Sequence, residues 1–265
     1  MTPAAAPAGG GQVVPSVLRA VRILDSFADG PPTANLSSLS RRLGLPPSST
    51  LALCNSLAQA GLLERDPHGA YRLGPHALEL SRSFLRQTDL HSEFQRALTE
   101  ADALRPVTVV CAVLQARDVV YIGRRDGTEP VAVAYEVGLR LPANCAASGL
   151  AMLSELSDAE LAERYPPSDR AGLPTLTPRS ISTVEELYAR LAQVRRRGYA
   201  VDDEETALGM LCVGVAIRSA GNTPAGAVAV SLPKTPARKR ELPVLAADVG
   251  RLAARVSGAL GAPPA

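Results

Sequence analysis

The stretch that decides the fold runs from Leu36 to Gly61 and reads LSSLSRRLGLPPSSTLALCNSLAQAG. Its leucines recur at helical spacing as far as Leu45, and Gly44 stands where the chain must reverse sharply. Pro46 and Pro47 end this element and open the next one, because proline is tolerated in the first turn of a helix. The stretch therefore predicts two helices joined by a tight turn.

The second of these helices, from Pro47 to about Ala60, has two different faces. At about 100° per residue, one face is mainly apolar and is expected to pack inward. It carries Thr50, Leu53, Cys54 and Leu57. The opposite face carries short or uncharged groups that can approach a base edge, namely Ser48, Ala52, Asn55 and Gln59, with Leu51 and Ser56 at its rims. This pattern is typical of a recognition helix, although two antiparallel helices of any all-α domain share it.

The residues that follow predict a wing. Leu62 and Leu63 lead into ERDPHGAYRL, which reads as two short strands around a Pro/Gly turn. Arg65 and Arg72 flank this turn, where they suit contacts with phosphates. The candidate contacts with double-stranded DNA are Arg19, Arg41, Arg42, Ser48, Ser49, Leu51, Ala52, Asn55, Ser56, Gln59, Arg65 and Arg72.

An amphipathic helix is expected ahead of this region, from Ser16 to Phe27, with Ser16 as its N-cap. Its apolar stripe consists of Val17, Ala20, Val21, Leu24 and Phe27. Arg19 and Arg22 lie off this stripe and are either solvated or in contact with backbone phosphate.

Length and composition allow two domains in a soluble protein. The chain has 265 residues, of which 46% are hydrophobic and 20% charged. No segment stays apolar long enough to span a bilayer, and the opening MTPAAAPAGGGQ lacks the features of a secretory signal. We expect residues 1–13 to form a disordered tail and the protein to be cytoplasmic.

The net charge is only +2, but the part up to Thr88 has eight arginines and five acidic residues. Nucleic-acid binding must therefore depend on local charge.

A linker helix is expected after the wing, over residues 75–88. Leu73, Ala77, Leu80 and Phe84 form an apolar seam at helical spacing. This seam pairs with a copy of itself or packs on its own domain. A second helix is expected from Leu90 to Leu104.

Beyond Pro106 the period changes to that of strands. Strands are expected at VTVVCAVLQ (107–115), DVVYIGRR (118–125), PVAVAYEV (130–137), the segment from Gly198 to Val201, Met210 to Arg218 and Ala225 to Leu232. Helices are expected after NCAASG, after a Ser157-Asp158 cap, from Ile181 to Arg197 and at the C-terminus, and an acidic loop at residues 202–205. The small residues before the first of these helices leave backbone N–H groups open to an anion. The pattern predicts an α+β domain, an antiparallel sheet flanked by helices.

The cysteines argue against a metal or redox site. Cys54, Cys111, Cys145 and Cys212 are far apart and form no CxxC pair, so we expect no metal and no cofactor. A cysteine-dependent enzyme would use Cys145, where a helix dipole would lower its pKa. No histidine follows His91, which argues against a Cys/His pair and against an enzyme.

Together these residues resemble the IclR family of bacterial transcription regulators. The resemblance covers Ser16 to Leu260 and rests in the DNA-binding part on SVLRAVRIL, LSRRLGLPPSST and GLLERDPHGAYRLGP. In the sensor part it rests on VVYIGRR, VGLRLPANCAASGLAML, TPRSIST and RRRGYAVDDEE, with Cys212 downstream. It implies a winged helix-turn-helix domain (14–74), a linker helix (75–88) and a GAF-like effector domain (89–265), assembled as a homodimer or homotetramer.

The resemblance also implies an effector site for a small organic acid. Backbone N–H groups of Ala147 and Ser148 would bind its carboxylate. Further polar or backbone contacts would come from Cys145, Asp202, Cys212, Ala229 and Ser231, and apolar walls from Pro130, Val133, Leu141 and Met210.

This sequence departs from the family at several functional positions. Leu51 and Ala52 stand where larger polar or basic residues are common, so base readout would shift to Asn55 or Gln59 or to groove shape. Asn144-Cys145 replaces a commoner His-Ala pair, and Leu150 replaces a frequent Lys, so the identity of the effector does not carry over. The expected function is that of a ligand-responsive transcription regulator. The alternative is an architectural DNA-binding protein with a vestigial sensor domain.

Overall fold

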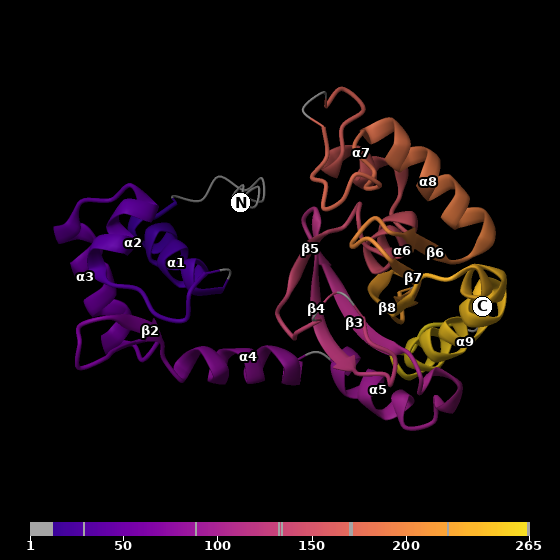
Figure 1. The fold of residues 1–265 in the computed structure, drawn as a ribbon, viewed down its shortest axis with the longest axis horizontal. Helices are drawn as coiled ribbons and strands as arrows, with labels where there is room; N and C mark the ends of the chain where they lie inside the picture. The colour runs from indigo at the N-terminus through magenta and orange to yellow at the C-terminus, as the bar shows by residue number, and fades with distance from the viewer. Residues whose placement is uncertain are drawn as a thin grey trace. The chain divides into compact units, whose positions relative to one another are not determined.

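The structure is a computed structural model that describes residues 13–28, 30–87, 89–131, 133, 135–169, 172–221 and 223–263 (Figure 1). These residues fall into two compact units that divide after Gln87. The expected disordered tail, apart from Val13, lies outside the described residues.

The N-terminal unit holds the expected helix-turn-helix and wing. Its elements are α1 (Pro15–Ala28), α2 (Leu36–Leu43), α3 (Pro47–Gln59), β1 (Leu63–Arg65), β2 (Tyr71–Leu73) and α4 (His76–Gln87). β1 and β2 pair antiparallel, with Leu63 opposite Leu73. Ile23, Leu39, Cys54 and Tyr71, each at most 1% exposed, form the centre of a small core that joins α1, α2 and α3 to the wing.

The first helix differs from the expectation in two respects. It begins at Pro15, so Ser16 lies inside the helix and is not its N-cap. Its buried side chains, Ile23 and Phe27, lie in its C-terminal half, whereas Val17 and Val21 are 58% and 46% exposed. The core of this unit therefore covers only half of the predicted apolar stripe.

The C-terminal unit is an antiparallel sheet with helices on both faces. Its helices are α5 (Asp89–Leu98), the 3₁₀-helix η1 (Asp102–Leu104), α6 (Ala147–Ser154), α7 (Asp158–Arg164), α8 (Val184–Arg197) and α9 (Pro236–Ala259). Its strands are β3 (Thr108–Gln115), β4 (Asp118–Arg125), β5 (Arg140–Pro142), β6 (Ala200–Asp203), β7 (Met210–Arg218) and β8 (Pro224–Pro233). They are ordered β5-β4-β3-β8-β7-β6, and all neighbouring strands are antiparallel.

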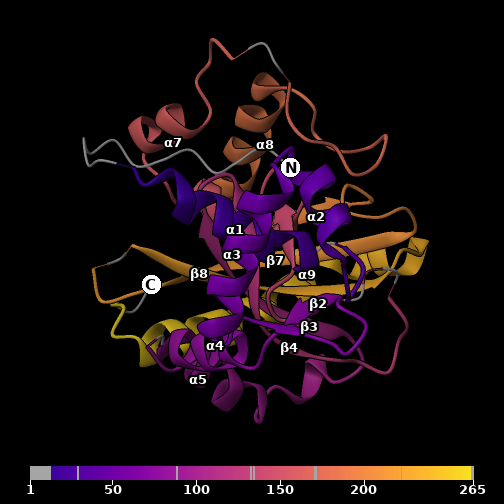
Figure 2. The same ribbon diagram turned by 90° about the vertical axis from the view of Figure 1, so that its left-hand side faces the viewer.

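The two faces of this sheet carry different helices. α6, α7 and α8 gather on one side, and α5 and α9 on the other (Figures 1 and 2). The core under α6 and α8 includes Leu150 and Leu187, both 0% exposed, together with Tyr121, Met210 and Cys212 from the sheet. The α+β prediction for this domain is confirmed.

Three local predictions were wrong. The described residues between 130 and 137 form no strand: Pro130 has no N–H, and the N–H of Tyr135 bonds to Val133 O at 3.1 Å instead of to a neighbouring strand. The strand that pairs with β4 on this side is β5, which follows at Arg140–Pro142.

The helix expected to continue to Leu104 ends at Leu98. The next three N–H groups bond to carbonyls three residues back, which tightens the chain into 3₁₀ geometry. The expected acidic loop begins later than predicted, because Asp202 and Asp203 are paired with β7 and the reversal starts at Glu204, whose φ is 71°.

Candidate DNA-binding surface and effector site

The tight turn before α3 fixes how this helix is presented. Gly44 adopts a φ of 64°, and its N–H and that of Leu45 bond to carbonyls of the last turn of α2. At the start of α3, Pro46 offers no side-chain cap. The first free N–H groups of the helix thus belong to Ser48, which is exposed, and Ser49, which is half-buried. A helix terminus of this kind favours a phosphate.

The two faces of α3 are divided as the sequence predicts. Thr50 and Cys54 are 0% exposed and Leu57 is 7% exposed. The outward face is exposed and consists of Ser48, Leu51, Ala52, Asn55, Ser56 and Gln59. The hydroxyl of Ser56 donates to Ala52 O at 3.0 Å, so its oxygen faces outward mainly as an acceptor. This face carries no charge.

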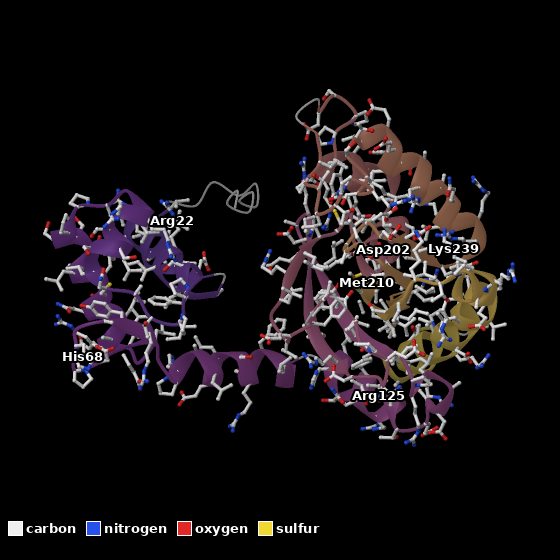
Figure 3. All side chains as sticks on the ribbon, in the orientation of Figure 1. Arg22, His68, Arg125, Asp202, Met210 and Lys239 are labelled. Atoms are coloured by element: carbon white, nitrogen blue, oxygen red, sulfur yellow. The ribbon has the colours of Figure 1, made fainter. Side chains whose placement is uncertain are left out.

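The wing is held rigid by its own turn. Asp66 Oδ1 accepts the backbone N–H groups of His68 and Ala70, both at 2.9 Å. Gly69 supplies the positive φ of 84° that the reversal needs. His68 lies at the tip of this hairpin (Figure 3).

The two wing arginines expected to contact phosphate both interact with other side chains of the protein. Arg65 lies over the ring of Tyr71 at 5.6 Å, and Arg72 pairs with Glu64 at 2.7 Å, with both partners exposed. An exposed pair of this kind contributes about 0–1 kcal/mol, so a phosphate can compete for Arg72 at small cost.

Of the remaining arginines, Arg19 and Arg41 are exposed. Arg42 has a structural contact that sequence analysis missed. Its Nη1 donates to Ser26 O at 2.7 Å and so joins α2 to the end of α1.

In the C-terminal unit, the backbone at the N-terminus of α6 packs closely against neighbouring backbone segments. Ala146 stands at the N-cap and offers no side-chain cap to the N–H groups of Ala147 and Ser148. A Cβ at Gly149 would lie 2.2 Å from Ala143 O, and one at Gly214 would lie 2.5 Å from Ala147 O. The helix start therefore rests directly on the backbone of β7.

Beside this helix start, polar side chains cluster on three strands. Asp202 on β6 lies opposite Cys212 on β7, which lies opposite Ser231 on β8. Ser231 Oγ lies 2.9 Å from the hydroxyl of Tyr135 and 3.4 Å from Cys212 Sγ. Asp202, Cys212 and Ser231 are 1–3% exposed. The four side chains form one buried polar group, which we call the polar cluster.

Two tyrosines of this region were missed by sequence analysis. The rings of Tyr121 and Tyr135 meet edge to face, with centroids 5.0 Å apart, and both are 3% exposed. Burial raises the pKa of both hydroxyls, which keeps them protonated as hydrogen-bond donors. The alternation of β4 could have identified Tyr121 as inward-facing. Tyr135 carried no such signal, because its segment does not form the expected strand.

All but one of the apolar residues implied for the effector site belong to the core of this unit or pack against it. Met210 and Ala229 are buried in the same core as the tyrosines, and Val133 and Leu141 are half-buried against it. Pro130 is exposed and is not part of this core. Figure 3 marks Met210 and Asp202, which lie on the neighbouring strands β7 and β6.

The hydrogen bonds of the Cys145 thiol go to groups outside the polar cluster. Its thiol donates to Pro174 O at 3.4 Å and accepts from the amide of Asn144 at the same distance. Burial raises the pKa of this thiol to about 11. A nucleophilic cysteine needs a lowered pKa, so the environment of Cys145 argues against the enzyme hypothesis.

Two buried carboxyl groups are left with free oxygens. Asp202 Oδ1 accepts the N–H groups of Glu205 and Thr206 at 2.6 and 3.2 Å, whereas Oδ2 takes no hydrogen bond from any described residue. Glu205 pairs with Arg190 at 2.7 Å, and its Oε2 is likewise without a partner in the described structure. Burial raises the pKa of Asp202, and it raises that of Glu205 to about 7 despite the nearby Arg190.

A Glu205→Gln variant is expected to flatten the pH dependence of stability. The unfolded glutamate ionises near 4.5 and the folded one near 7, so the free energy of unfolding of the wild type should fall as pH rises through this window. The expected fall is about 2–3 kcal/mol, and Asp202 adds to it with the same sign. Urea unfolding between pH 4.5 and 7.5 measures the slope. Glu163→Gln, at an exposed position, should leave it unchanged, and an equal slope in the Glu205→Gln variant would contradict the assignment.

Within the described residues, no group of three or more His, Cys, Asp or Glu side chains is arranged to hold a metal ion. None of the helices in this part of the chain combines the length and the apolar character needed to cross a membrane.

Comparison with known proteins agrees with this architecture. The IclR helix-turn-helix domain matches residues 16–67, and the C-terminal domain of the bacterial transcriptional regulator IclR matches residues 82–258. The HTH-type transcriptional regulator XynR of Escherichia coli is 32% identical, over 77% of this chain and 81% of XynR. The Transcriptional repressor IclR of the same organism is 30% identical, over 87% of this chain and 83% of the repressor.

Solved structures show the same fold. The repressor BlcR of Agobacterium tumefaciens is 35% identical, with a TM-score of 0.61 over 96% of this chain and 100% of BlcR. An IclR homologue of Microbacterium hydrocarbonoxydans, solved with 4-hydroxybenzoate, has a TM-score of 0.76 at 24% identity, over 92% of this chain and 98% of the homologue. The chain therefore belongs to the IclR family of bacterial transcriptional regulators, which combine a DNA-binding helix-turn-helix domain with a ligand-binding C-terminal domain.

Proposed function

We propose that this regulator reads a double-stranded operator in the cytoplasm through the outward face of α3, and that a small carboxylic or aromatic acid in the C-terminal unit controls its affinity. The observation that supports the reading mode is the division of α3 into a buried side and an exposed, uncharged side. Short side chains such as Ala52 allow the helix to enter the major groove closely.

Within that face, two amides supply the sequence readout. Asn55 and Gln59 are exposed and one helical turn apart, and such amides pair with adenine in the major groove. The N-terminus of α3 and the arginines Arg19, Arg41, Arg65 and Arg72 hold phosphates and fix the register.

The effector site lies between the N-terminus of α6 and the polar cluster. The N–H groups of Ala147 and Ser148 take the carboxylate, and the Ser148 hydroxyl, buried and without a partner among the described residues, stands beside them. Asp202 Oδ2 accepts a hydrogen bond from a hydroxyl of the ligand. The 4-hydroxybenzoate held by a family member supports an acid of this kind.

Tyr135 is the side chain that such a ligand must displace. Its ring fills the space beside Tyr121, and its hydroxyl is bonded to Ser231. It belongs to an irregular segment and not to a strand, so it can move without breaking the sheet. A ligand that favours one position of this segment shifts the equilibrium between two arrangements of the protein.

A homodimer, alone or paired into a tetramer, is proposed as the working form. The first half of α1 exposes apolar side chains, with Val17 and Leu18 at 58% and 55%, and α4 exposes Leu80 at 51%. Exposed apolar side chains along two helices of one small unit favour contact with a second copy.

Selection of bound fragments from the source genome, with and without candidate acids, tests the whole proposal. We expect enrichment of inverted repeats, as a two-fold dimer requires, and a change in their occupancy with one acid. Failure to enrich any sequence would refute operator binding. Enrichment that no acid alters, together with no rise in Tm with any acid, would favour the architectural alternative.

A further inference from the structure

A cleft of about 510 Å³ opens in the C-terminal unit where α5 ends beside β4. Three arginines line it, Arg105, Arg124 and Arg125, together with the polar side chains of Gln95, Thr99 and Thr128. None of these residues belongs to the effector site proposed above.

Arg125 is the residue that the protein itself leaves unsatisfied. It ends β4 beside α5, and its Nη1 donates to Leu98 O at 3.0 Å (Figure 3). Its Nε and Nη2 are buried and find no acceptor among the described residues. Burial, together with the neighbouring Arg105, lowers the pKa of this guanidinium. Buried guanidinium N–H groups that lack an acceptor are unfavourable unless one is supplied.

The neighbouring charges do not supply that acceptor. Arg105 pairs with Asp102 at 2.7 Å, but their side chains are 72% and 76% exposed, so the pair is weak. Arg124 pairs with Asp126 at 2.6 Å and also donates to Tyr135 O. The cleft therefore has three cationic side chains and a single lining carboxylate, that of Asp126.

The wall opposite α5 is fixed in place. The N–H groups of Thr128 and Glu129 both bond to Pro106 O, at 3.0 and 3.1 Å. Gly127 packs so closely that a Cβ there would lie 2.3 Å from the same oxygen. Gly127 N–H donates to Thr108 Oγ1 at 3.3 Å, which ties the loop to β3. The backbone that directly follows Arg124 and Arg125 is thus fixed before any ligand arrives, which lowers the entropic cost of binding.

We propose that this cleft is a second anion site, in which Arg105, Arg124 and Arg125 bind a phosphate-type oxyanion. A tetrahedral oxyanion offers several acceptors in different directions, whereas a single carboxylate offers two in one plane. A tetrahedral oxyanion can therefore accept hydrogen bonds from the planar guanidinium groups of three different arginines. Free inorganic phosphate and the phosphate group of a small metabolite share this chemistry.

Thermal unfolding of the full chain in phosphate, compared with chloride at the same pH and ionic strength, tests the site. At ten times its Kd, phosphate should raise Tm by about 3 °C in the wild type. Arg125→Gln should lose most of this rise, and Arg105→Gln should weaken phosphate binding about three- to tenfold. Line broadening of the phosphate ³¹P NMR signal gives the same comparison without unfolding the protein.

Arg240→Gln is the matched control, because Arg240 is an exposed arginine of α9 in the same unit. It should keep the full rise in Tm. A parallel titration with glycerol phosphate shows whether the site prefers a phosphomonoester to the free anion. The proposal would be overturned if chloride raised the wild-type Tm as much as phosphate does, or if phosphate raised the Tm of Arg125→Gln as much as that of the wild type. If Arg125→Gln does not fold, Arg105→Gln carries the test, since Arg105 is exposed, and unchanged phosphate binding in that variant would also overturn it.

Discussion

An Ala52→Glu variant is expected to lose operator binding by at least about 100-fold while it keeps its fold. Ala52 lies in the middle of the outward face of α3 and is exposed, so a glutamate there is accommodated in the free protein. On DNA, the carboxylate would be brought against base-edge acceptors and the phosphate backbone. Like charges placed together at an interface cost several kcal/mol, which corresponds to this loss.

Competition binding to a selected operator at fixed salt measures the loss, and urea unfolding shows that the fold is intact. Ala254→Glu makes the same change at an exposed position of α9 in the other unit and should bind as the wild type does. If Ala52→Glu bound the operator within a fewfold of the wild type, α3 would not be the reading helix.

The elements of this protein that follow from local physics were predictable. The faces of α3 and α8 are set by helical periodicity, and the apolar side chains that recur at helical spacing in α8, Val184, Leu187, Leu191 and Val194, are all buried. Ser157 and Thr183 both close capping boxes at the starts of α7 and α8. Ser157 belongs to the cap expected for α7.

What the sequence does not reveal depends on contacts between distant segments. Tyr135 reads as part of an apolar strand, but its hydroxyl reaches Ser231, 96 residues later in the chain. Arg42 reads as a DNA contact, but it holds the end of α1 through Ser26. In both cases the side chain is placed by a partner that no local periodicity identifies.

The proposed effector site also depends on contacts between distant segments. The family resemblance implies Ala147, Ser148, Asp202, Cys212 and Ser231, and the structure places them around the start of α6. Cys145 is implied as well, and its thiol donates to Pro174 O at 3.4 Å. Side chains of consecutive residues at the beginning of a helix point in different directions. Sequence spacing alone therefore does not show which of them faces a ligand.

Gly214→Ala is expected to cost about 1–3 kcal/mol of unfolding free energy, although glycine to alanine in a strand is ordinarily stabilising. The new Cβ would lie 2.5 Å from Ala147 O and 2.9 Å from Ser148 N. Both are backbone atoms at the start of α6, so the clash cannot be relieved by rotation of a side chain. The helix start must move away from β7.

That movement should also weaken effector binding at least tenfold, because the N–H groups proposed to hold the carboxylate belong to Ala147 and Ser148. Urea unfolding gives the stability, and titration with the acid that raises the wild-type Tm most gives the affinity. Gly250→Ala is the matched control, since a Cβ at Gly250 of α9 meets no atom within 4 Å, and it should stabilise the protein by about 1 kcal/mol.

The two readouts of Gly214→Ala separate packing from recognition. Operator affinity without acid should be retained, because the winged helix belongs to the other compact unit. Reduced stability with unchanged acid affinity would show that the acid binds away from the start of α6, and wild-type stability would show that α6 does not rest on β7 as closely as the 2.5 Å approach requires. Loss of both stability and acid affinity, with operator binding kept, is the result expected if the N-terminus of α6 holds the effector.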